Sequence, residues 1–282
     1  MPMNGSPTGS TANQDSTFSM AADAARAYEA AVTVFMAPFA DIAIDAAGIA
    51  AGDHVLDLAC GTGVVTRRLA ARVGPAGRVC GSDLNPAMLA VAGEIGPAGV
   101  EWSQAPADAL PYPDSSFDAV VCQQSLQFFP DKVAALGEVS RVLRPTGRLA
   151  ATIWAAPEHS PYFAAQSAGV LAAIGDKGLN PLRTAMPADP ERLLTEWAVT
   201  AGLADVETRI VHATVRLPDL AAFVELQVAA TPWGALLKAA GPQAVETASR
   251  TTLDGLQHLV LPDGSAALRF TSALLVAARS AD

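Results

Sequence analysis

The sequence predicts an α/β protein with a doubly wound, Rossmann-like and mostly parallel sheet of seven strands. Between residues 51 and 156, short apolar runs alternate with amphipathic segments, which is typical of parallel strands joined by crossover helices. A glycine-rich turn, Asp57-x-x-x-Gly61-x-Gly63, follows the first apolar run. A carboxylate, Asp83, ends the second run about twenty residues further on, where doubly wound folds place a ligand-binding acid.

Two segments precede this alternation. Residues 1–17 are rich in Ser, Thr, Gly, Asn and Pro and contain almost nothing apolar, so we expect a disordered tail. Residues 18–50 are rich in alanine and carry aromatic side chains at helical spacing, including Tyr28 and Phe35. We expect N-terminal helices that close over a ligand site.

Residues 51–156 form the expected core. Its first unit is a strand at 54–59 and a helix that ends at Val73. Asn85 has the position of an N-cap before a helix that begins with Pro86. The segment Pro145-Thr146-Gly147 is expected to turn the chain into the fifth strand. The further strands are expected at 78–82, 100–104, 117–122 and 148–154, and the further helices at 86–94 and 132–143.

The sheet pattern is interrupted twice after residue 156. Residues 157–187 and 218–260 are expected to be helical inserts that form a lid over the carboxyl ends of the strands. Between them, residues 188–217 predict a core helix and strand, and residues 261–282 contain the last core strand at 266–278.

Composition and charge narrow the function classes. The 282 residues include 18 Lys and Arg against 28 Asp and Glu, and the net charge of −10 argues against broad nucleic-acid contact. No apolar run reaches the ~18 residues of a membrane span, and no signal peptide is visible, so we expect a cytoplasmic protein. The cysteines Cys60, Cys80 and Cys122 lack metal-site spacing, so no metal is expected.

The glycine turn suits a ligand that approaches bare backbone at a helix N-terminus. A dinucleotide-binding motif has a third glycine at the position that Thr66 occupies here. A phosphate-binding P-loop requires the sequence Gly-Lys-Ser/Thr, which this turn lacks. S-adenosylmethionine is the third candidate, and its cationic amino group suits the acceptor-only carboxylate of Asp57. A turn that merely packs a helix against the sheet also remains open.

Three further segments narrow the choice: residues 103–111, residues 117–124 and residues 141–149. Together with the glycine turn, and in this order, they resemble class I S-adenosylmethionine-dependent methyltransferases of the ubiquinone- and menaquinone-biosynthesis type, the methyltransferase type 11 family. The resemblance is strongest over residues 52–154. It implies a Rossmann-like fold with an antiparallel last strand.

The resemblance also implies cofactor contacts. Asp57 would lie near the ammonium group of the cofactor, Asp83 would bind the ribose hydroxyls, and Tyr28 would cover the cofactor. The backbone at Ala59, Gly61 and Gly63 would hold the methionine moiety. The remaining contacts would come from Leu84 and Met88 on the adenine, Ala107 and Asp108 at the adenine edge, and Gln123 along the methionine side. Relatives commonly have Asp where this chain has Pro106, and Asp108 is the candidate substitute.

The chemistry expected from this resemblance is methyl transfer to a small, hydrophobic or aromatic molecule at oxygen, carbon or nitrogen. The activated sulfonium methyl needs chiefly alignment, so a base is required only for a poor nucleophile. His159, after the fifth strand, is the candidate base. The candidate acceptor-binding residues are Phe35, Phe128, Trp154, Tyr162, Phe163 and Trp233.

Two other functions remain open at this point: an NAD-dependent oxidoreductase, and a protein that binds S-adenosylmethionine without transferring its methyl group. The sequence does not distinguish a monomer from a homodimer.

Overall fold

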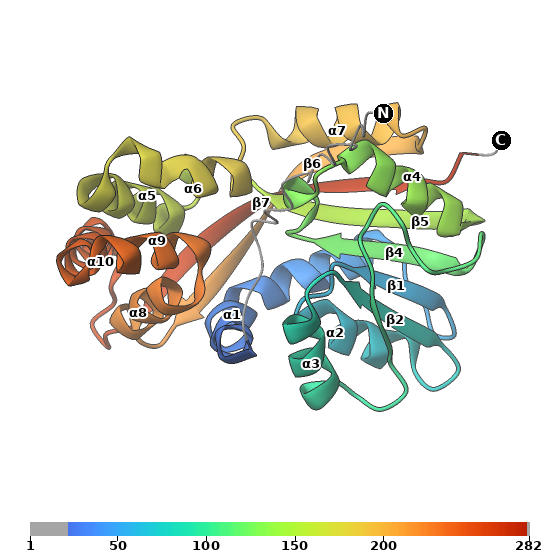
Figure 1. Cartoon of the computed structure of the whole chain (residues 1–282), viewed down its shortest axis with the longest axis horizontal. Coiled ribbons are helices and arrows are strands. Elements are labelled where there is room, and N and C mark those ends of the chain that lie inside the picture. The colour runs from blue at the N-terminus through green and yellow to red at the C-terminus, as the bar shows by residue number, and fades with distance from the viewer. Residues whose placement is uncertain (1–21, 281–282) are drawn as a thin grey trace, which may run out of the picture.

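The computed structural model describes residues 22–280, and the tail expected at 1–17 lies outside them (Figure 1). A seven-stranded sheet in the order β3-β2-β1-β4-β5-β7-β6 forms the centre. The first five strands pair in parallel, and β7 pairs antiparallel with both β5 and β6. The predicted doubly wound sheet with an antiparallel last strand is confirmed.

The core elements follow the expected alternation closely. The apolar residues of β1 are buried, as a central parallel strand requires. Asn85 Oδ1 accepts a hydrogen bond from the Ala87 amide at 2.9 Å, which confirms the predicted N-cap. The elements are β1 His54–Leu58, α2 Val64–Val73, β2 Arg78–Asp83, α3 Pro86–Ile95, β3 Glu101–Gln104, β4 Phe117–Gln123, α4 Lys132–Val142 and β5 Leu143–Trp154.

The fifth strand differs from the expectation. β5 begins at Leu143, so Pro145-Thr146-Gly147 lies within the strand and does not form a separate turn before it. Leu143 pairs with Phe117, and the next pair is Arg148 with Ala119, so the additional residues of β5 form an irregularity in the ladder. Proline cannot donate a ladder hydrogen bond, and such an irregularity accommodates it.

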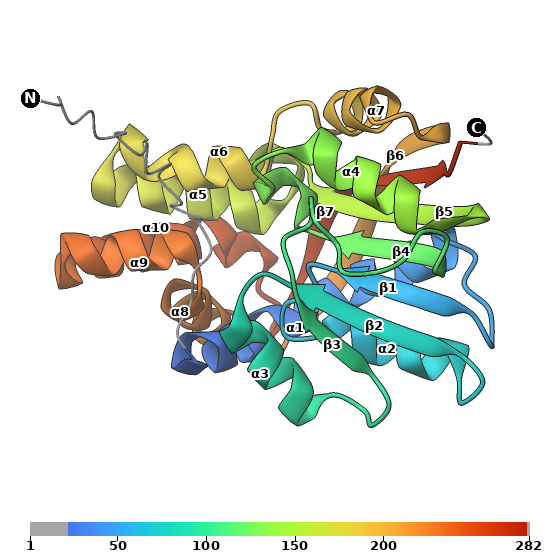
Figure 2. The same ribbon diagram turned by 45° about the vertical axis from the view of Figure 1, so that its right-hand side comes forward.

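A helical lobe lies at one end of the sheet. It consists of α5 Pro161–Ile174, α6 Asn180–Ala185, α8 Leu220–Ala230, α9 Pro232–Ala240 and α10 Pro242–Leu256. The long strands β6 Ala204–Leu217 and β7 Ala266–Ala278 stay paired with each other, extend beyond the end of β5 and run into this lobe (Figures 1 and 2). Ends of both strands join its buried cluster, with Leu217 and Phe270 almost fully buried. The α7 helix, Pro190–Thr200, packs on the sheet instead.

One helix, α1 Ala22–Ala46, forms the described part of residues 18–50, where several helices were expected. Phe35 and Phe39 join the buried cluster of the lobe, whereas Ala43 and Ile44 join the cluster beneath α2 and the sheet. Within α1, the segment Asp23–Ala46 has the length and the hydropathy of a membrane-spanning helix. Core helices of proteins that do not span a membrane can have the same length and hydropathy. The helix thus connects the sheet to the lobe.

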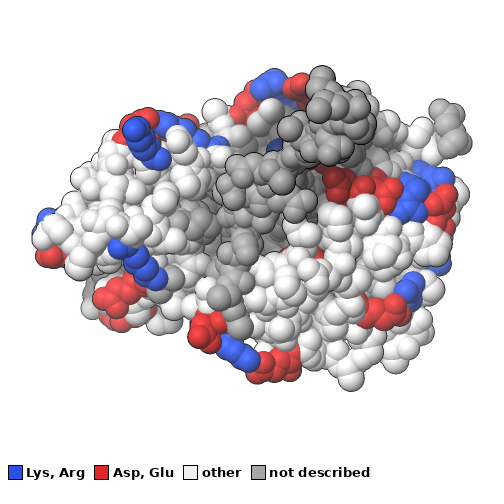
Figure 3. Space-filling view, viewed as in Figure 1, with Lys and Arg blue, Asp and Glu red and all other residues white. Residues whose placement is uncertain are grey.

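Charged side chains on the face seen in Figure 3 gather in small groups of both signs. Ion pairs between exposed side chains of the protein include Arg26 with Glu94 and Arg183 with Asp176. This pattern differs from the continuous basic stripe that contact with a nucleic-acid backbone calls for.

Candidate functional site

The glycine turn joins β1 to α2 with several residues in the left-handed region. The φ angles are +56° at Ala59, +54° at Gly61 and +85° at Gly63. A side chain built on Gly61 would meet no atom within 4 Å, so the outer side of the turn is open. A side chain on Gly63 would come within 3.1 Å of the Trp102 ring. Gly61 therefore keeps space free outside the turn, and Gly63 allows close packing beneath it.

Asp83 lies against this turn. β1 and β2 pair in parallel, which brings their carboxyl ends together. One carboxylate oxygen of Asp83 accepts from the Gly61 amide and the other from the Asn85 amide, each at 2.8 Å. Burial raises the pKa of Asp83, and these amide hydrogen bonds oppose that rise. The acid expected to bind a ligand therefore also fixes the shape of the glycine turn.

Asp57 is almost fully buried at the end of β1 and accepts a hydrogen bond from the Thr66 hydroxyl. Burial raises the pKa of Asp57 to about 7, although the hydrogen bonds from Thr66 act against this. Thr66 was noted in the sequence only because it replaces a third glycine. In the structure, it supplies the partner that a buried carboxyl group needs.

A contact between α1 and the turn was not apparent from the sequence. The Glu29 carboxylate accepts hydrogen bonds from the Thr62 hydroxyl and from Arg67 Nη2, the latter at 2.6 Å. Arg67 Nη1 also donates to the Thr62 carbonyl at 2.8 Å. The side chains of Arg67 and Glu29 are 23% and 20% exposed, so water only partly screens this pair. Glu29 thereby fixes α1, and with it Tyr28, above the glycine turn.

Removing Glu29 should destabilise the chain more than removing an exposed acid that pairs with the same helix. In Glu29→Ala, Thr62 and Arg67 lose their shared acceptor in a partly buried site, which costs about 1–3 kcal/mol of unfolding free energy. Glu94→Ala, which removes the surface partner of Arg26, is the control and should cost much less. Urea unfolding measures both variants, and equal losses would contradict this role of Glu29.

The other residues expected near the cofactor lie in different environments. Leu84 is 53% exposed beside the turn, whereas Met88 is 2% exposed and packs with Ala25 and Val91. Asp108 is exposed after β3, and Ala107 is half-buried beside it. Of this group, Leu84 and Asp108 have surface available for a ligand.

Gln123 connects β4 to α1. Its Nε2 donates to the Met36 carbonyl at 2.6 Å. The next residue but one, Ser125, donates from its hydroxyl to the Ala59 carbonyl at 3.4 Å. The carboxyl end of β4 therefore touches both α1 and the glycine turn.

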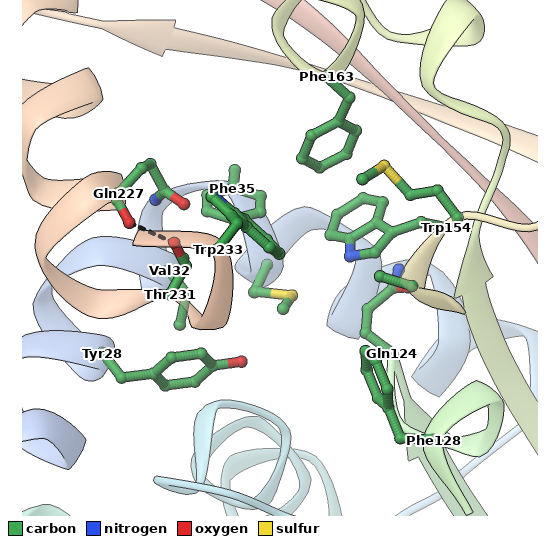
Figure 4. A pocket seen from close by; sticks show the side chains of 13 residues that line it. Tyr28, Val32, Phe35, Gln124, Phe128, Trp154, Phe163, Gln227, Thr231 and Trp233 are labelled. Atoms are coloured by element: carbon green, nitrogen blue, oxygen red, sulfur yellow. Dashed lines mark hydrogen bonds between the residues drawn. The ribbon is translucent and has the colours of Figure 1, made fainter. Parts of the chain in front are cut away.

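A cavity of about 50 Å³ lies between this end of the sheet and the helical lobe (Figure 4). Tyr28 lines it from α1, and burial raises the pKa of the Tyr28 hydroxyl. The described residues that line the cavity are Tyr28, Val32, Phe35, Met36, Gln124, Phe128, Trp154, Phe163, Ala185, Met186, Gln227, Thr231 and Trp233. Its polar members include Gln124, Gln227 and Thr231, none of which was expected at the site from the sequence, although Gln124 ends the segment 117–124.

Five of the six aromatic residues expected to bind the acceptor line this cavity: Phe35, Phe128, Trp154, Phe163 and Trp233. Tyr162 does not. It is 1% exposed, its ring packs on Phe223 at 4.9 Å, and its hydroxyl accepts from Gln166 Nε2 at 3.0 Å. Neighbouring residues of a helix point about 100° apart, which is why Phe163 faces the cavity and Tyr162 the core.

The structure does not bring His159 into the cavity. His159 is exposed in the short 3-10 helix Pro157–His159 after β5, and it is not part of the cavity lining. Its carbonyl accepts from the Thr271 hydroxyl at 2.7 Å, which ties this turn to β7 and leaves the imidazole at the surface. His159 follows β5, as expected from the sequence, and its role as a base stays a prediction that the cavity lining does not support.

Comparisons with known proteins agree with this geometry. Residues 56–151 match the family model "Methyltransferase domain". The chain is 46% identical over 111 residues to the ubiquinone/menaquinone biosynthesis C-methyltransferase UbiE of Hahella chejuensis, covering 38% of this chain and 45% of that one. The chain spans about half the length of the curated relatives it matches.

Solved structures share the fold. A SAM-dependent methyltransferase from Aquifex aeolicus has a TM-score of 0.51 at 21% identity, over 68% of this chain and 92% of that one. A phosphoethanolamine N-methyltransferase 2 of Haemonchus contortus has a TM-score of 0.59 at 17% identity, over 92% of this chain and 57% of that one. These solved structures show that the chain shares their fold. Residues 56–151 match the methyltransferase-domain family model, and the chain is similar there to ubiquinone/menaquinone biosynthesis C-methyltransferases, in agreement with the order of its motifs.

Proposed function

We propose that this chain binds S-adenosylmethionine at the glycine turn and transfers its methyl group to a small, mostly apolar molecule held in the cavity. The observation that carries the proposal is the open turn at Gly61, with Asp83 on its amide, next to a cavity that shares Tyr28 and the end of β4 with it. The family match over residues 56–151 supports the same cofactor.

The residues present fit this cofactor. The open space outside Gly61 leaves room for a ligand against the backbone, and Asp83 retains lone pairs for ribose hydroxyls. A buried carboxyl at Asp57 suits a cationic amino group, and exposed Leu84 offers apolar surface to an adenine ring. Nothing in the comparisons favours an NAD-dependent enzyme, and Thr66 is engaged by Asp57 where a dinucleotide site needs glycine.

The cavity indicates the class of acceptor. Its walls are aromatic and aliphatic, with a few polar groups, which is the usual composition of a small-molecule site. Among the residues that the structure describes, its lining includes no Asp, Glu, His, Lys or Arg. When bound, the cofactor supplies an activated methyl group. The chain's own residues then align the acceptor and exclude water, and the acceptor must be nucleophilic without a strong protein base.

The pKa of Asp57 predicts a proton linkage. Because burial raises this pKa from 3.8 to about 7, the folded chain holds more protons than the unfolded chain between about pH 4 and 7. Folding stability contributed by this group therefore falls as the pH rises through that window. A cationic amino group against Asp57 favours the carboxylate, so cofactor binding at pH 6 should release a proton.

Calorimetry with S-adenosylhomocysteine in two buffers of different ionisation enthalpy measures this release. We expect close to one proton for the wild type at pH 6 and none for Asp57→Asn. Identical binding enthalpies in the two buffers for the wild type would contradict the linkage.

Substitutions in the cavity walls should change the affinity for the methyl acceptor and leave the affinity for the cofactor unchanged. We expect Trp233→Ala to raise the KM for an acceptor by about tenfold or more, while S-adenosylhomocysteine affinity is kept. Phe163 is 2% exposed and packs on Trp154, so Phe163→Ala would cost about 3–5 kcal/mol of folding stability, and Phe163→Leu is the usable variant. Trp197→Ala is the matched control, because Trp197 lies on α7 beneath Lys132 and is not among the residues that line the cavity.

The test of the proposed function is a screen of small apolar metabolites with methyl-labelled S-adenosylmethionine. Label transferred to one of them, with equal formation of S-adenosylhomocysteine, is the expected result. Wild-type kinetics in Trp233→Ala would place the acceptor elsewhere, and methylation of bulk RNA or protein would overturn the small-molecule assignment.

A further inference from the structure

The cavity contains a buried polar group that the protein itself leaves without a partner. Gln124 is 4% exposed, and its Nε2 donates to Ser272 Oγ on β7 at 2.8 Å. Its other terminal atom, Oε1, has no hydrogen-bond partner. Burying an amide oxygen without a donor is unfavourable, and native structures leave few such atoms unpaired.

The backbone holds Gln124 in place. Its φ is +55°, which is uncommon for a residue other than glycine, and it follows directly after β4. Its amide donates to the Thr152 carbonyl at 2.8 Å, and its carbonyl accepts from Gln127 Nε2 at 3.2 Å. Figure 4 shows the side chain between Trp154 and Phe128, at the wall of the cavity. Such backbone strain tends to occur at functional sites.

Within residues 22–280, one other buried side-chain atom without a partner belongs to the cavity lining. Among the described residues, the buried side-chain nitrogen and oxygen atoms without a partner include Trp233 Nε1, whereas Gln166 and Gln127 do not line the cavity. An indole N–H only donates, and an amide oxygen only accepts. The cavity wall therefore offers one unused acceptor at Gln124 and one unused donor at Trp233.

Gln124 lies in the segment after β4 that connects the cavity to the glycine turn. The adjacent residue, Ser125, contacts the Ala59 carbonyl within that turn. In the described part of the chain no charged side chain lines the cavity. A charged ligand group would therefore be buried without a counter-ion, whereas a neutral donor would complete the hydrogen bonding of Gln124.

We propose that Gln124 selects a neutral molecule bearing a hydroxyl or N–H group, whose hydrogen it accepts, while Trp233 donates to an oxygen or nitrogen of the same molecule. The proposal rests on the proposed function in that this molecule is the methyl acceptor. It narrows the acceptor class to mostly apolar compounds with a polar donor group, and it makes Gln124 a specificity-determining residue.

The test uses three small ring probes, because the cavity is only about 50 Å³. Phenol donates and accepts, anisole only accepts, and toluene does neither. Their affinities for the full chain with S-adenosylhomocysteine present are measured by ligand-observed NMR. We expect phenol to bind about tenfold more tightly than toluene, as one hydrogen bond to a buried group implies, with anisole between them.

Gln124→Met should remove the preference for phenol over anisole without weakening toluene binding. Gln166→Met, which changes a buried glutamine outside the cavity, is the matched control and should keep the preference. If Gln124→Met does not fold, Trp233→Phe is tested in its place. This variant should weaken the binding of phenol and anisole but not that of toluene.

Failure to detect phenol binding, equal affinities for the three probes in the wild type, or a phenol preference that survives in folded Gln124→Met would each overturn the proposal. Calorimetry with S-adenosylhomocysteine on the same samples distinguishes a failure of the proposed function from a failure of the role of Gln124. Absence of that binding refutes the proposed function, whereas normal binding without a phenol preference refutes only the role of Gln124.

Discussion

Asp83→Ala should lower the affinity for S-adenosylhomocysteine by about 10- to 150-fold. The carboxylate is proposed to accept the ribose hydroxyls, and hydrogen bonds to a charged group contribute about 1.5–3 kcal/mol each. It also accepts the amides of Gly61 and Asn85, so its loss leaves both amides unpaired and loosens the turn. The effect should therefore lie toward the upper end of this range.

Calorimetry on the folded variant measures this affinity. Asp53→Ala is the control, because Asp53 also accepts a backbone amide, that of Ala50, but in the loop before β1 at the opposite end of that strand. Its S-adenosylhomocysteine affinity should equal that of the wild type. An unchanged dissociation constant in Asp83→Ala would show that the acid serves only the fold.

Gly61→Val should lower the affinity for the cofactor product S-adenosylhomocysteine by about 100-fold or more. The added side chain would occupy the open space outside the turn, where the ligand is expected against the backbone. The φ of +54° also strains a branched residue, which costs about 1–2 kcal/mol of stability.

Gly48→Val separates these two effects. Gly48 has a φ of +68° and open space around it, but it lies between α1 and β1, away from the site. Both variants should lose similar stability in thermal unfolding, and only Gly61→Val should lose S-adenosylhomocysteine binding. Normal S-adenosylhomocysteine binding by folded Gly61→Val would show that the turn only packs α2 against the sheet.

The sequence was informative where local chemistry determines structure. Strand-forming runs, the N-cap at Asn85 and the spacing from Gly63 to Asp83 depend on neighbouring residues, and the structure has each at its expected place. The start of β5 was wrong because a proline and a glycine within a bulged strand have the same pattern as a turn.

The candidate site was less predictable because it depends on contacts between distant segments. Glu29 meets Thr62 and Arg67 only when α1 crosses the glycine turn, and no periodic pattern encodes that contact. Hydrophobicity also could not separate Phe163, which lines the cavity, from Tyr162, which is buried in the core. The role proposed for Gln124 could not be predicted from the sequence, because it depends on a buried oxygen without a hydrogen-bond partner, which only a three-dimensional structure shows.

The central claim is that the glycine turn binds S-adenosylmethionine, and one calorimetric experiment tests it most directly. S-adenosylhomocysteine and NADH are titrated separately into the wild-type chain at pH 7.5. We expect saturable, one-to-one binding of S-adenosylhomocysteine and no binding of NADH. Saturable binding of NADH without binding of S-adenosylhomocysteine would contradict it.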